Sequence, residues 1–291
     1  MQYSTFAAID IGSYDVILEI FEISKKQGIR SVDKICHRME LGKDTYTLGK
    51  IRPEMEEELC RVLADFVRIM EGYRVDDYRA TASSAISEAS NSLYVLGKIH
   101  QLTGFSVTVL SNSEQRFLSY KALAAMEDNF NKIIEKGTAI LDLDGGSFQI
   151  SLFDKDALVT TQNIRMGSLR IRERLAGIQS ETEHYEEMVE ELIWNEVSSF
   201  KKMYLKDRKI ENIMLIGDVF TDSVYQNIEE KTTKIISREN FNTWYEKIIR
   251  QSPMELAVKL GIPLENASLM YPSAVIYKCL IDMMGAEHIW I

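Results

Sequence analysis

The chain has 291 residues, a formal net charge of −10 at pH 7, 45% hydrophobic residues and 27% charged residues. This length allows two domains with cores of ordinary size, and the balance is that of a soluble globular protein. The acidic charge argues against non-specific binding to a nucleic acid polymer. Because no apolar run approaches the roughly 20 residues that span a bilayer, we expect no membrane segment.

Cysteine usage and the N-terminus favour a cytoplasmic protein. Cys36, Cys60 and Cys279 are odd in number and far apart, which fits reduced thiols better than a disulfide framework. The first ten residues, MQYSTFAAID, contain no basic region and no cleavage site, so we expect no secretion signal. The four histidines have no metal-ligand spacing, which argues against a zinc site.

Residues 6–21 predict a β-hairpin with an acid and a glycine turn at its tip. The first apolar strand ends in Asp10, Gly12 and Ser13 follow as the turn, and the next strand alternates apolar and polar residues. A third strand over residues 30–41 would complete an antiparallel meander.

After this meander, the sequence predicts alternating helices and strands. Residues 42–50 are polar and bounded by glycines, which predicts a loop. Residues 52–73 predict a helix, because Pro53 stands near its start and its apolar residues share one side. The other expected elements are strands over 78–83 and 105–110 and helices over 87–102 and 113–126.

Residues 138–153 repeat the pattern of the first hairpin. An apolar strand closes with Asp142, and a turn through Asp144, Gly145, Gly146 and Ser147 leads into a second strand. Backbone N–H groups in such a turn form a concavity for an anion, and the carboxylate can hold the accompanying cation. The repeat predicts two similar lobes, residues 1–127 and 128–291, whose hairpin tips face a common cleft. The alternative is two unrelated hairpins with ordinary Gly-Ser turns.

The rest of the second half is also predicted to alternate. We expect strands over 157–165 and 213–217 and helices over 183–205, 240–249, 254–260 and 267–284. The acidic run near the start of the first of these helices is interpreted as a solvated face. In the last helix, Pro272 is expected in the first turn and Gly285 just past the end.

Five motifs, in order along the chain, carry a family resemblance. They are IDIGS (9–13), ATASSAISEASN (80–91), VLSNSEQR (109–116), LDLDGGS (141–147) and MGSLRIRERL (166–175). With these motifs the chain resembles the exopolyphosphatase/guanosine pentaphosphate phosphatase (Ppx/GppA) family of the actin–sugar kinase–Hsp70 superfamily. The resemblance implies an α/β fold of two ribonuclease-H-like lobes with an interlobe cleft. It also implies hydrolysis of the terminal phosphoanhydride of polyphosphate or of a guanosine penta- or tetraphosphate, with Mg²⁺ or Mn²⁺; a homodimer is left open.

The resemblance also assigns roles to individual residues. Asp10 and Asp142 would hold the metal, and Glu114 would activate the attacking water. The remaining candidates would bind phosphate: Gly12, Ser13, Gly145, Gly146, Ser147 and Arg170. Two candidates have an alternative structural interpretation. Ser111 and Glu114 also fit a capping box at a helix start, and Arg170 also fits a surface arginine at a helix start.

Five residues depart from the family pattern. Tyr14 stands where an asparagine is usual, and Ser87 stands where a phosphate-facing arginine is expected. Asp144 and Asp218 replace glycines of two loops, although aspartate is also an ordinary turn residue. Gln149 replaces a glutamate and cannot be an anionic metal ligand.

These departures leave several functions open. We favour an active hydrolase; the second hypothesis is a catalytically impaired relative that binds a nucleotide or polyphosphate as a sensor. A sugar-kinase-like phosphotransferase is a third and more distant hypothesis.

Overall fold

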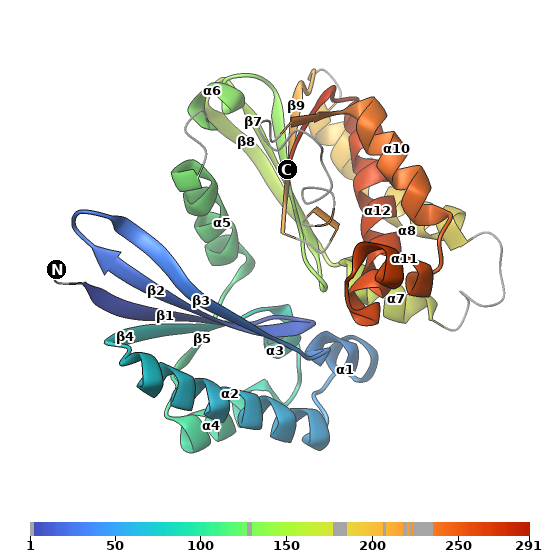
Figure 1. Cartoon of the computed structure of the whole chain (residues 1–291). Helices are drawn as coiled ribbons and strands as arrows, with labels where there is room; N and C mark the ends of the chain where they lie inside the picture. The colour runs from blue at the N-terminus through green and yellow to red at the C-terminus, as the bar shows by residue number, and fades with distance from the viewer. Residues whose placement is uncertain are drawn as a thin grey trace. The chain divides into compact units, whose positions relative to one another are not determined.

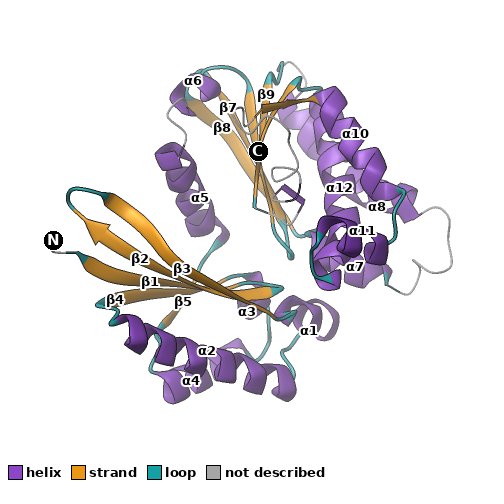
Figure 2. Ribbon diagram, in the orientation of Figure 1, coloured by secondary structure: helices purple, strands orange, loops and turns teal. Residues whose placement is uncertain are grey.

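The computed structural model of the chain describes residues 3–126, 130–176, 185–205, 208–217, 220–221, 223 and 235–291. Contacts divide the chain into two compact units, Met1–Arg116 and Phe117–Ile291. Each unit has its own mixed sheet with helices, which confirms the predicted α/β fold of two lobes (Figures 1 and 2). The division falls inside helix α5 (Asn112–Met126), and the domain boundary expected after residue 127 stays a prediction.

The first unit is built on a five-stranded sheet. In chain order its elements are β1 (Ser4–Ile11), β2 (Asp15–Ser24), β3 (Gly28–Arg38), α1 (Leu41–Leu48), α2 (Pro53–Tyr73), β4 (Asp77–Ala82), α3 (Ser84–Ser87), α4 (Ser92–Thr103), β5 (Val107–Val109) and the start of α5. The strand order is β3-β2-β1-β4-β5, with an antiparallel meander of β1, β2 and β3 and with β4 and β5 parallel to β1. This arrangement agrees with the ribonuclease-H-like lobe that the resemblance implies.

Alternation along β1 decides which of its residues enter the core. Ala7, Ile9 and Ile11 are buried in one hydrophobic cluster with apolar side chains of α2 and α4. Because successive side chains of a strand point to opposite faces, Ala8 and Asp10 belong to the other face of the sheet. The acid that closes β1 is therefore exposed, on the face away from α2 and α4 (Figure 1).

The loop predicted over residues 42–50 is wrong, because α1 occupies most of this segment. Asp44 is only 1% exposed, and its carboxylate accepts hydrogen bonds from the backbone N–H and the Nε of Arg52, both at 2.9 Å. The hydroxyl of Thr45 donates to the carbonyl oxygen of Ala85 at 2.7 Å. Partners that lie elsewhere in the sequence thus bury polar residues whose local pattern suggested a loop.

The helix predicted over residues 87–102 is interrupted between α3 and α4. In the interruption, Oδ1 of Asn91 accepts a hydrogen bond from the N–H of Ile51 at 3.0 Å, and Nδ2 of Asn91 donates one to the carbonyl oxygen of Ile51 at 2.9 Å. The N–H of Ser90 donates to the carbonyl oxygen of Gly49 at 2.9 Å. These bonds hold residues 90 and 91 against the segment before α2, so the helix cannot run straight through.

The second unit is built on a six-stranded sheet. After α5, its elements are α6 (Phe130–Ile134), β6 (Thr138–Leu143), β7 (Phe148–Asp154), β8 (Ala157–Ile164), α7 (Ser168–Leu175), α8 (Tyr185–Phe200), the π-helical turn η1 (Lys201–Leu205), β9 (Asn212–Ile216), β10 (Ile235–Ser237), α10 (Arg238–Ile249), α11 (Pro253–Leu260), α12 (Leu264–Met284) and β11 (His288–Trp290). The order is β10-β11-β9-β6-β7-β8, again with a meander (β6, β7, β8) and a strand, β9, parallel to its first member. The repeated hairpin therefore belongs to a repeated topology.

Helices cover both faces of this second sheet. On one face, Phe130 and Ile133 of α6 form a cluster with Ile140 and Phe153, and side chains of α5 pack against it. On the other, α12 packs against α7, α8, α10 and α11 (Figure 1). Strands β6 and β7 are consequently buried along nearly their whole length.

Two details of the second unit differ from the predictions. Helix α12 begins at Leu264, with Pro263 as its N-cap residue, so Pro272 lies in the helix interior and not in its first turn. Strands β10 and β11 were not predicted, because three residues are too few to show a period of two. The start predicted for the helix over 183–205 lies outside the described residues, as does Asp218.

Among the helices that the structure describes, none has the length and apolar character needed to cross a bilayer.

Candidate functional site

The tip of the β1–β2 hairpin is a tight turn around Gly12. The N–H of Gly12 donates to the carbonyl oxygen of Asp15 at 2.9 Å. A Cβ on Gly12 would lie 2.8 Å from Oδ1 of Asp15 and 3.0 Å from its carbonyl oxygen, closer than side chains normally approach. The turn therefore depends on the absence of a side chain at Gly12.

The hydroxyl of Ser13 points into the protein. Ser13 is 4% exposed, and its Oγ lies 2.7 Å from the hydroxyl oxygen of Tyr46, which lies 2.8 Å from Oγ of Ser84. The N–H of Gly42 also donates to the carbonyl oxygen of Ser13, at 2.7 Å. The first predicted phosphate turn is thus fixed by α1 and α3. Sequence reasoning missed Tyr46, because its segment was interpreted as a loop.

Asp10 lies next to the carboxyl end of β1, and Glu114 follows the carboxyl end of β5, which runs parallel to β1. Asp10 pairs in register with Thr81 of β4, whose hydroxyl lies 3.3 Å from its Oδ1. Glu114 follows β5, the neighbour of β4, and the positive charge of Arg79 on β4 contributes to lowering its pKa. Arg79 and Thr81 point to the same face of β4. Asp10 and Glu114 lie at the same edge of the sheet, where β1 and β5 end.

The capping-box geometry of Glu114 is present. Its Oε2 accepts from the N–H of Ser111 at 2.9 Å and from the hydroxyl of Ser111 at 2.7 Å, and Oγ of Ser111 lies 3.3 Å from the N–H of Glu114. The hydrogen bond from the Ser111 backbone is the main reason why the pKa of Glu114 is below its ordinary value. Glu114 is exposed and ionised at neutral pH, and a catalytic role for it stays a prediction.

Tyr14 and Ser87 are two of the departures from the family pattern, and in the first unit Tyr14 is half-buried whereas Ser87 is exposed. The guanidinium of Arg38 lies 5.2 Å from the centre of the Tyr14 ring, and its Nη1 lies 3.4 Å from Oδ2 of Asp15. Burial raises the pKa of Asp15 above its ordinary value despite this cation. Ser87 is the exposed last residue of α3. A phenol and a cation thus lie beside each other next to the Gly12 turn.

In the second unit, Asp144 hydrogen bonds to the turn that it begins. Its Oδ1 accepts from the N–H of Gly146 at 2.5 Å and from the N–H of Ser147 at 2.8 Å. Its own N–H donates to the carbonyl oxygen of Ser147 at 3.0 Å. Two N–H groups expected to bind phosphate therefore already have an anionic acceptor within the chain.

The start of α7 holds the same turn from its carbonyl side. The N–H groups of Ser168 and Arg170 donate to the carbonyl oxygens of Asp144 (3.1 Å) and Gly145 (2.9 Å). Nε of Arg170 donates to the carbonyl oxygen of Gly146 at 2.8 Å. The structure thus brings the predicted residues 145–147 and Arg170 together, with Arg170 as a support of the turn.

Asp142 is the candidate metal ligand of this unit. It is half-buried, and Ser119 of α5 donates a hydrogen bond to its Oδ2 at 2.9 Å. Burial, and to a smaller extent the charge of Asp144, raises the pKa of Asp142 to about 6. No Lys, Arg or His of the described chain contributes to that pKa, so the carboxylate has no cation beside it.

Gln149 and Asn163 lie in register across β7 and β8, and Gln149 also lies opposite Asp142 of β6. Gln149 is 5% exposed, and Nδ2 of Asn163 lies 3.5 Å from Oγ of Ser147. Two amides thus lie opposite each other on β7 and β8, and Gln149 stands where the family pattern has an acid. Sequence reasoning had no signal for Asn163, because its proximity depends on strand register.

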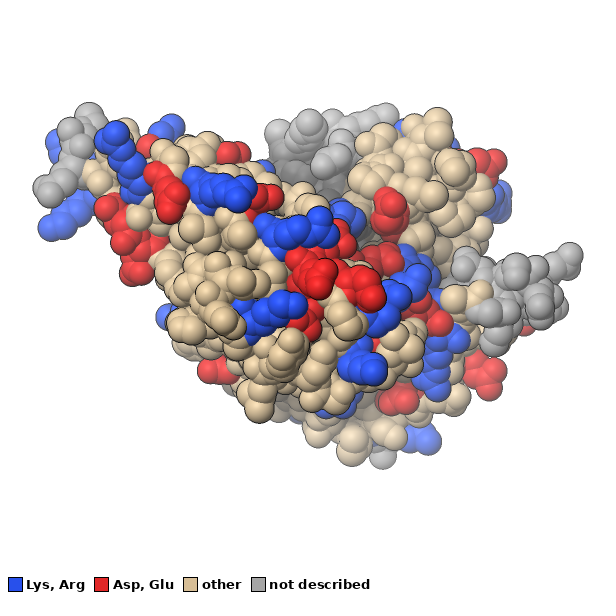
Figure 3. Space-filling view, turned by 90° about the horizontal axis from the view of Figure 1, so that it is seen from below, with Lys and Arg blue, Asp and Glu red and all other residues tan. Residues whose placement is uncertain are grey.

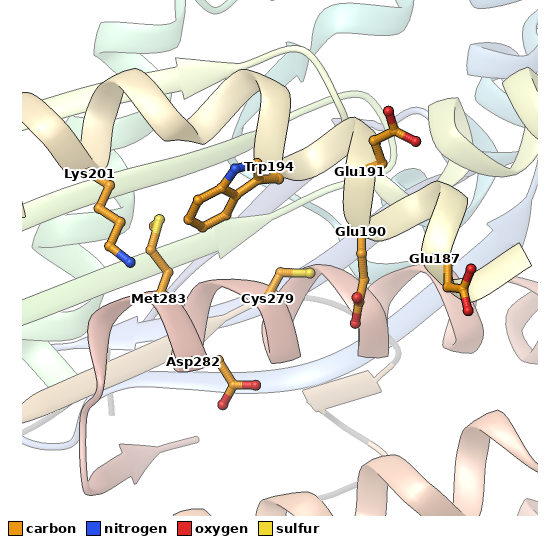
Figure 4. Close-up of a pocket in the computed structure, with 8 residues that line it drawn as sticks. All are labelled: Glu187, Glu190, Glu191, Trp194, Lys201, Cys279, Asp282 and Met283. Atoms are coloured by element: carbon orange, nitrogen blue, oxygen red, sulfur yellow. The ribbon is translucent and has the colours of Figure 1, made fainter. Parts of the chain in front are cut away.

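A separate cavity of about 460 Å³ lies between α8 and α12. Lys201 Nζ lies 5.2 Å from the centre of the Trp194 ring there. Figure 4 shows the lining residues: Glu187, Glu190, Glu191, Trp194, Lys201, Cys279, Asp282 and Met283. None of the predicted site residues lines it, and its acidic side chains would repel a polyphosphate.

Charges of both signs share the molecular face shown in Figure 3. Lys and Arg side chains lie among Asp and Glu side chains there, and a group of acidic ones gathers near the middle. The described residues of this face thus present a mixed-charge surface, in keeping with the overall charge of −10.

Comparisons with known proteins agree with the motifs. The sequence model of the Ppx/GppA phosphatase family matches residues 19–291. The bifunctional 3-dehydroquinate synthase/phosphatase of Fusobacterium nucleatum is 21% identical over 310 residues, covering 97% of this chain and 44% of that protein. Exopolyphosphatase 1 of Mycobacterium leprae is 25% identical over 144 residues, covering 49% of this chain and 41% of that protein. The chain thus spans less than half the length of these curated relatives.

Solved structures support the fold. An exopolyphosphatase of Cytophaga hutchinsonii aligns with a TM-score of 0.81 at 17% identity, covering 98% of this chain and 93% of that one. A Ppx/GppA family member of Aquifex aeolicus aligns with a TM-score of 0.76 at 19% identity, covering 99% and 93%. At such identities the likeness establishes the fold alone.

Proposed function

The chain belongs to the Ppx/GppA phosphatase family, and from this premise we propose that it is a metal-dependent phosphoanhydride hydrolase. The substrate would be polyphosphate or a guanosine penta- or tetraphosphate, and a water molecule would attack its terminal phosphate. One observation carries the proposal. Asp142, a half-buried carboxylate without a cation beside it in the described chain, closes a strand next to a glycine turn that α7 holds in place.

Mg²⁺ or Mn²⁺ would compensate the negative charge of the Asp142 carboxylate. Both ions prefer oxygen ligands, and Asp142 offers a carboxylate whose charge burial disfavours. Such a cation would neutralise this carboxylate and the charge on phosphate oxygens. Asp10, at the corresponding position of the first unit, is the second candidate ligand. Within the described ranges, no three His, Cys, Asp or Glu side chains group closely enough to hold a metal.

The remaining roles fall to groups already held in place. Glu114, kept ionised by Ser111, would take the proton of the attacking water. The turns at Gly12-Ser13 and at residues 145–147 would orient phosphate oxygens through backbone N–H groups. Arg170 would act by holding the second turn and by adding positive charge to it.

The proposal is tested by a phosphate-release panel. Purified protein is incubated with polyphosphate, guanosine pentaphosphate, guanosine tetraphosphate or nucleoside triphosphates, each with Mg²⁺, with Mn²⁺ and with a chelator. We expect metal-dependent release that Asp142→Asn and Glu114→Ala reduce strongly. Absence of release from every substrate would overturn the hydrolase, whereas unchanged release by Glu114→Ala would overturn only the role of Glu114.

A sensor that binds without turnover is the second candidate function. It is favoured by the amide Gln149 in place of an acid and by the internal hydrogen bonds of Asp144. Calorimetry would then detect binding of polyphosphate or a guanosine polyphosphate by protein that releases no phosphate. A homodimer and a cytoplasmic location also remain predictions.

A further inference from the structure

The N–H groups of Gly146 and Ser147 form an anion-binding position in the turn at residues 144–147, which we call the seat. We propose that the carboxylate of Asp144 occupies this seat and excludes phosphate from it until the side chain rotates away. Asp144 would thus be an internal competitor that sets how strongly the turn binds a substrate. The inference rests on the proposed function only in taking phosphate as the outside ligand.

The first step is the identity of the seat. The N–H groups of Gly146 and Ser147 converge on a single oxygen, Oδ1 of Asp144, at 2.5 and 2.8 Å. Consecutive N–H groups that converge in this way are the donors with which a glycine turn binds an anion. An oxygen of a phosphate would need the same two donors, so it cannot bind them while Oδ1 does.

The second step is the rigidity of the backbone around the seat. Hydrogen bonds from α7 engage the carbonyl oxygens of residues 144, 145 and 146. A Cβ on Gly167 would lie 2.3 Å from the carbonyl oxygen of Asp144 and 2.5 Å from the N of Ser147, so the backbone before α7 packs directly against the turn. The turn cannot readily rearrange to offer other donors, and rotation of the Asp144 side chain is the simplest way to free the seat.

The third step is the size of the competition. Asp144 is tethered to the turn by its own backbone, so its effective concentration at the seat is high, on the order of millimolar or more. A ligand that needs the open seat has its apparent affinity reduced by the fraction of molecules in which the seat is open. Phosphate alone would therefore bind weakly to this turn.

The experiment uses the full chain and two variants, with inorganic pyrophosphate in chelator-containing buffer as the probe. Asp144→Ala removes the acceptor, and Ala suits this position because the φ of Asp144 is not positive. Asp144→Asn removes the charge but keeps an oxygen that can accept the same two N–H groups. The readout is the amide chemical shifts of Gly146 and Ser147 together with calorimetric affinity.

We expect pyrophosphate to leave both amide signals of the wild type unmoved. In Asp144→Ala both signals should move, with affinity raised at least about tenfold, while Asp144→Asn should stay close to the wild type. Equal gains in both variants would show that charge alone matters and would overturn the proposal. Movement of both signals in the wild type would overturn it even if Asp144→Ala did not fold.

This test is independent of turnover. Protein that releases no phosphate in the panel above can still show the difference between the two variants. Conversely, an active hydrolase whose Gly146 and Ser147 amides bind pyrophosphate in the wild type would keep the proposed function and overturn the competitor role of Asp144.

Discussion

The hydroxyl of Ser119 donates a hydrogen bond to Oδ2 of Asp142 across 2.9 Å and joins helix α5 to the end of strand β6. This neutral donor lowers the pKa of Asp142, but burial raises it more, so the pKa stands at about 6. Asp144 adds a like charge. The ionised form of Asp142 therefore destabilises the second unit unless a cation binds.

Replacing Asp142 should consequently stabilise the metal-free protein. With a pKa near 4 when unfolded and about 6 when folded, this carboxyl lowers the free energy of unfolding at neutral pH by up to about 3 kcal/mol. Asp142→Asn keeps an acceptor for Ser119 and removes the charge. In chelator at pH 7.5, we expect its melting temperature to exceed that of the wild type by several degrees.

The pH dependence gives the sign of this effect. A carboxyl with a raised pKa in the folded state does not lower the free energy of unfolding below about pH 4. It lowers it progressively between about pH 4 and 6, and by the full amount above that. The two melting temperatures should therefore converge at pH 4. Asp65→Asn, in an exposed pair with Arg68 on α2, is the control and should show no such trend. A variant less stable than the wild type at pH 7.5 would contradict the prediction.

Variants at residues 111 and 114 can separate capping from catalysis. Glutamine also closes a capping box, so Glu114→Gln should keep the melting temperature while reducing phosphate release about 10²- to 10⁴-fold. Ser111→Ala breaks the cap and leaves the carboxylate, so it should lower the melting temperature with a much smaller effect on release. If Glu114→Gln retains full activity, Glu114 is a capping residue and not the base.

Local pattern predicted the parts of this fold that local chemistry determines. An apolar strand that ends in an acid, a glycine turn and a following strand that alternates predicted both hairpins, β1–β2 and β6–β7. Pro53 and the shared side of the apolar residues predicted α2. The hydrogen bonds of Asp144 connect it to residues two and three positions later, which is why its role as a turn residue could be weighed from the sequence.

Features that depend on distant partners could not be predicted. The sequence of helix α1 has the pattern of a loop. The helix is held by hydrogen-bond contacts of Thr45 with Ala85 and of Tyr46 with Ser84, which lie far away in the sequence. In the same way, the hydrogen bond between Ser119 and Asp142 joins residues 23 positions apart, so no short sequence pattern predicts it. The motifs located the candidate residues, but they could not show which of their donors already have acceptors.

Gly167 should be intolerant of any side chain. Its ideal Cβ position lies 2.3 Å from the carbonyl oxygen of Asp144, so Gly167→Ala must displace the turn or the start of α7. We expect a loss of about 2–4 kcal/mol in the free energy of unfolding of the second unit, measured in urea. Gly97→Ala in α4 is the matched control, since its Cβ would meet open space and helix propensity predicts a gain of up to about 1 kcal/mol. Equal behaviour of the two variants would contradict the close packing.

The hydroxyl of Tyr46 should stabilise the first turn by linking Ser13 to Ser84. Tyr46→Phe removes the oxygen between these two hydroxyls, which lies 2.7 Å from Oγ of Ser13 and 2.8 Å from Oγ of Ser84. Among the described residues, the buried hydroxyl of Ser13 then keeps a 3.5 Å contact to Ser84. Because a buried hydroxyl that loses its partner costs about 1–3 kcal/mol, the first unit should become less stable by that amount. Tyr94→Phe, on the exposed face of α4, is the control and should be nearly neutral. Urea unfolding followed by amide exchange in residues 12–14 would measure both effects. If Tyr46→Phe is as stable as Tyr94→Phe and its turn exchanges no faster, the hydroxyl chain does not hold the Gly12-Ser13 turn.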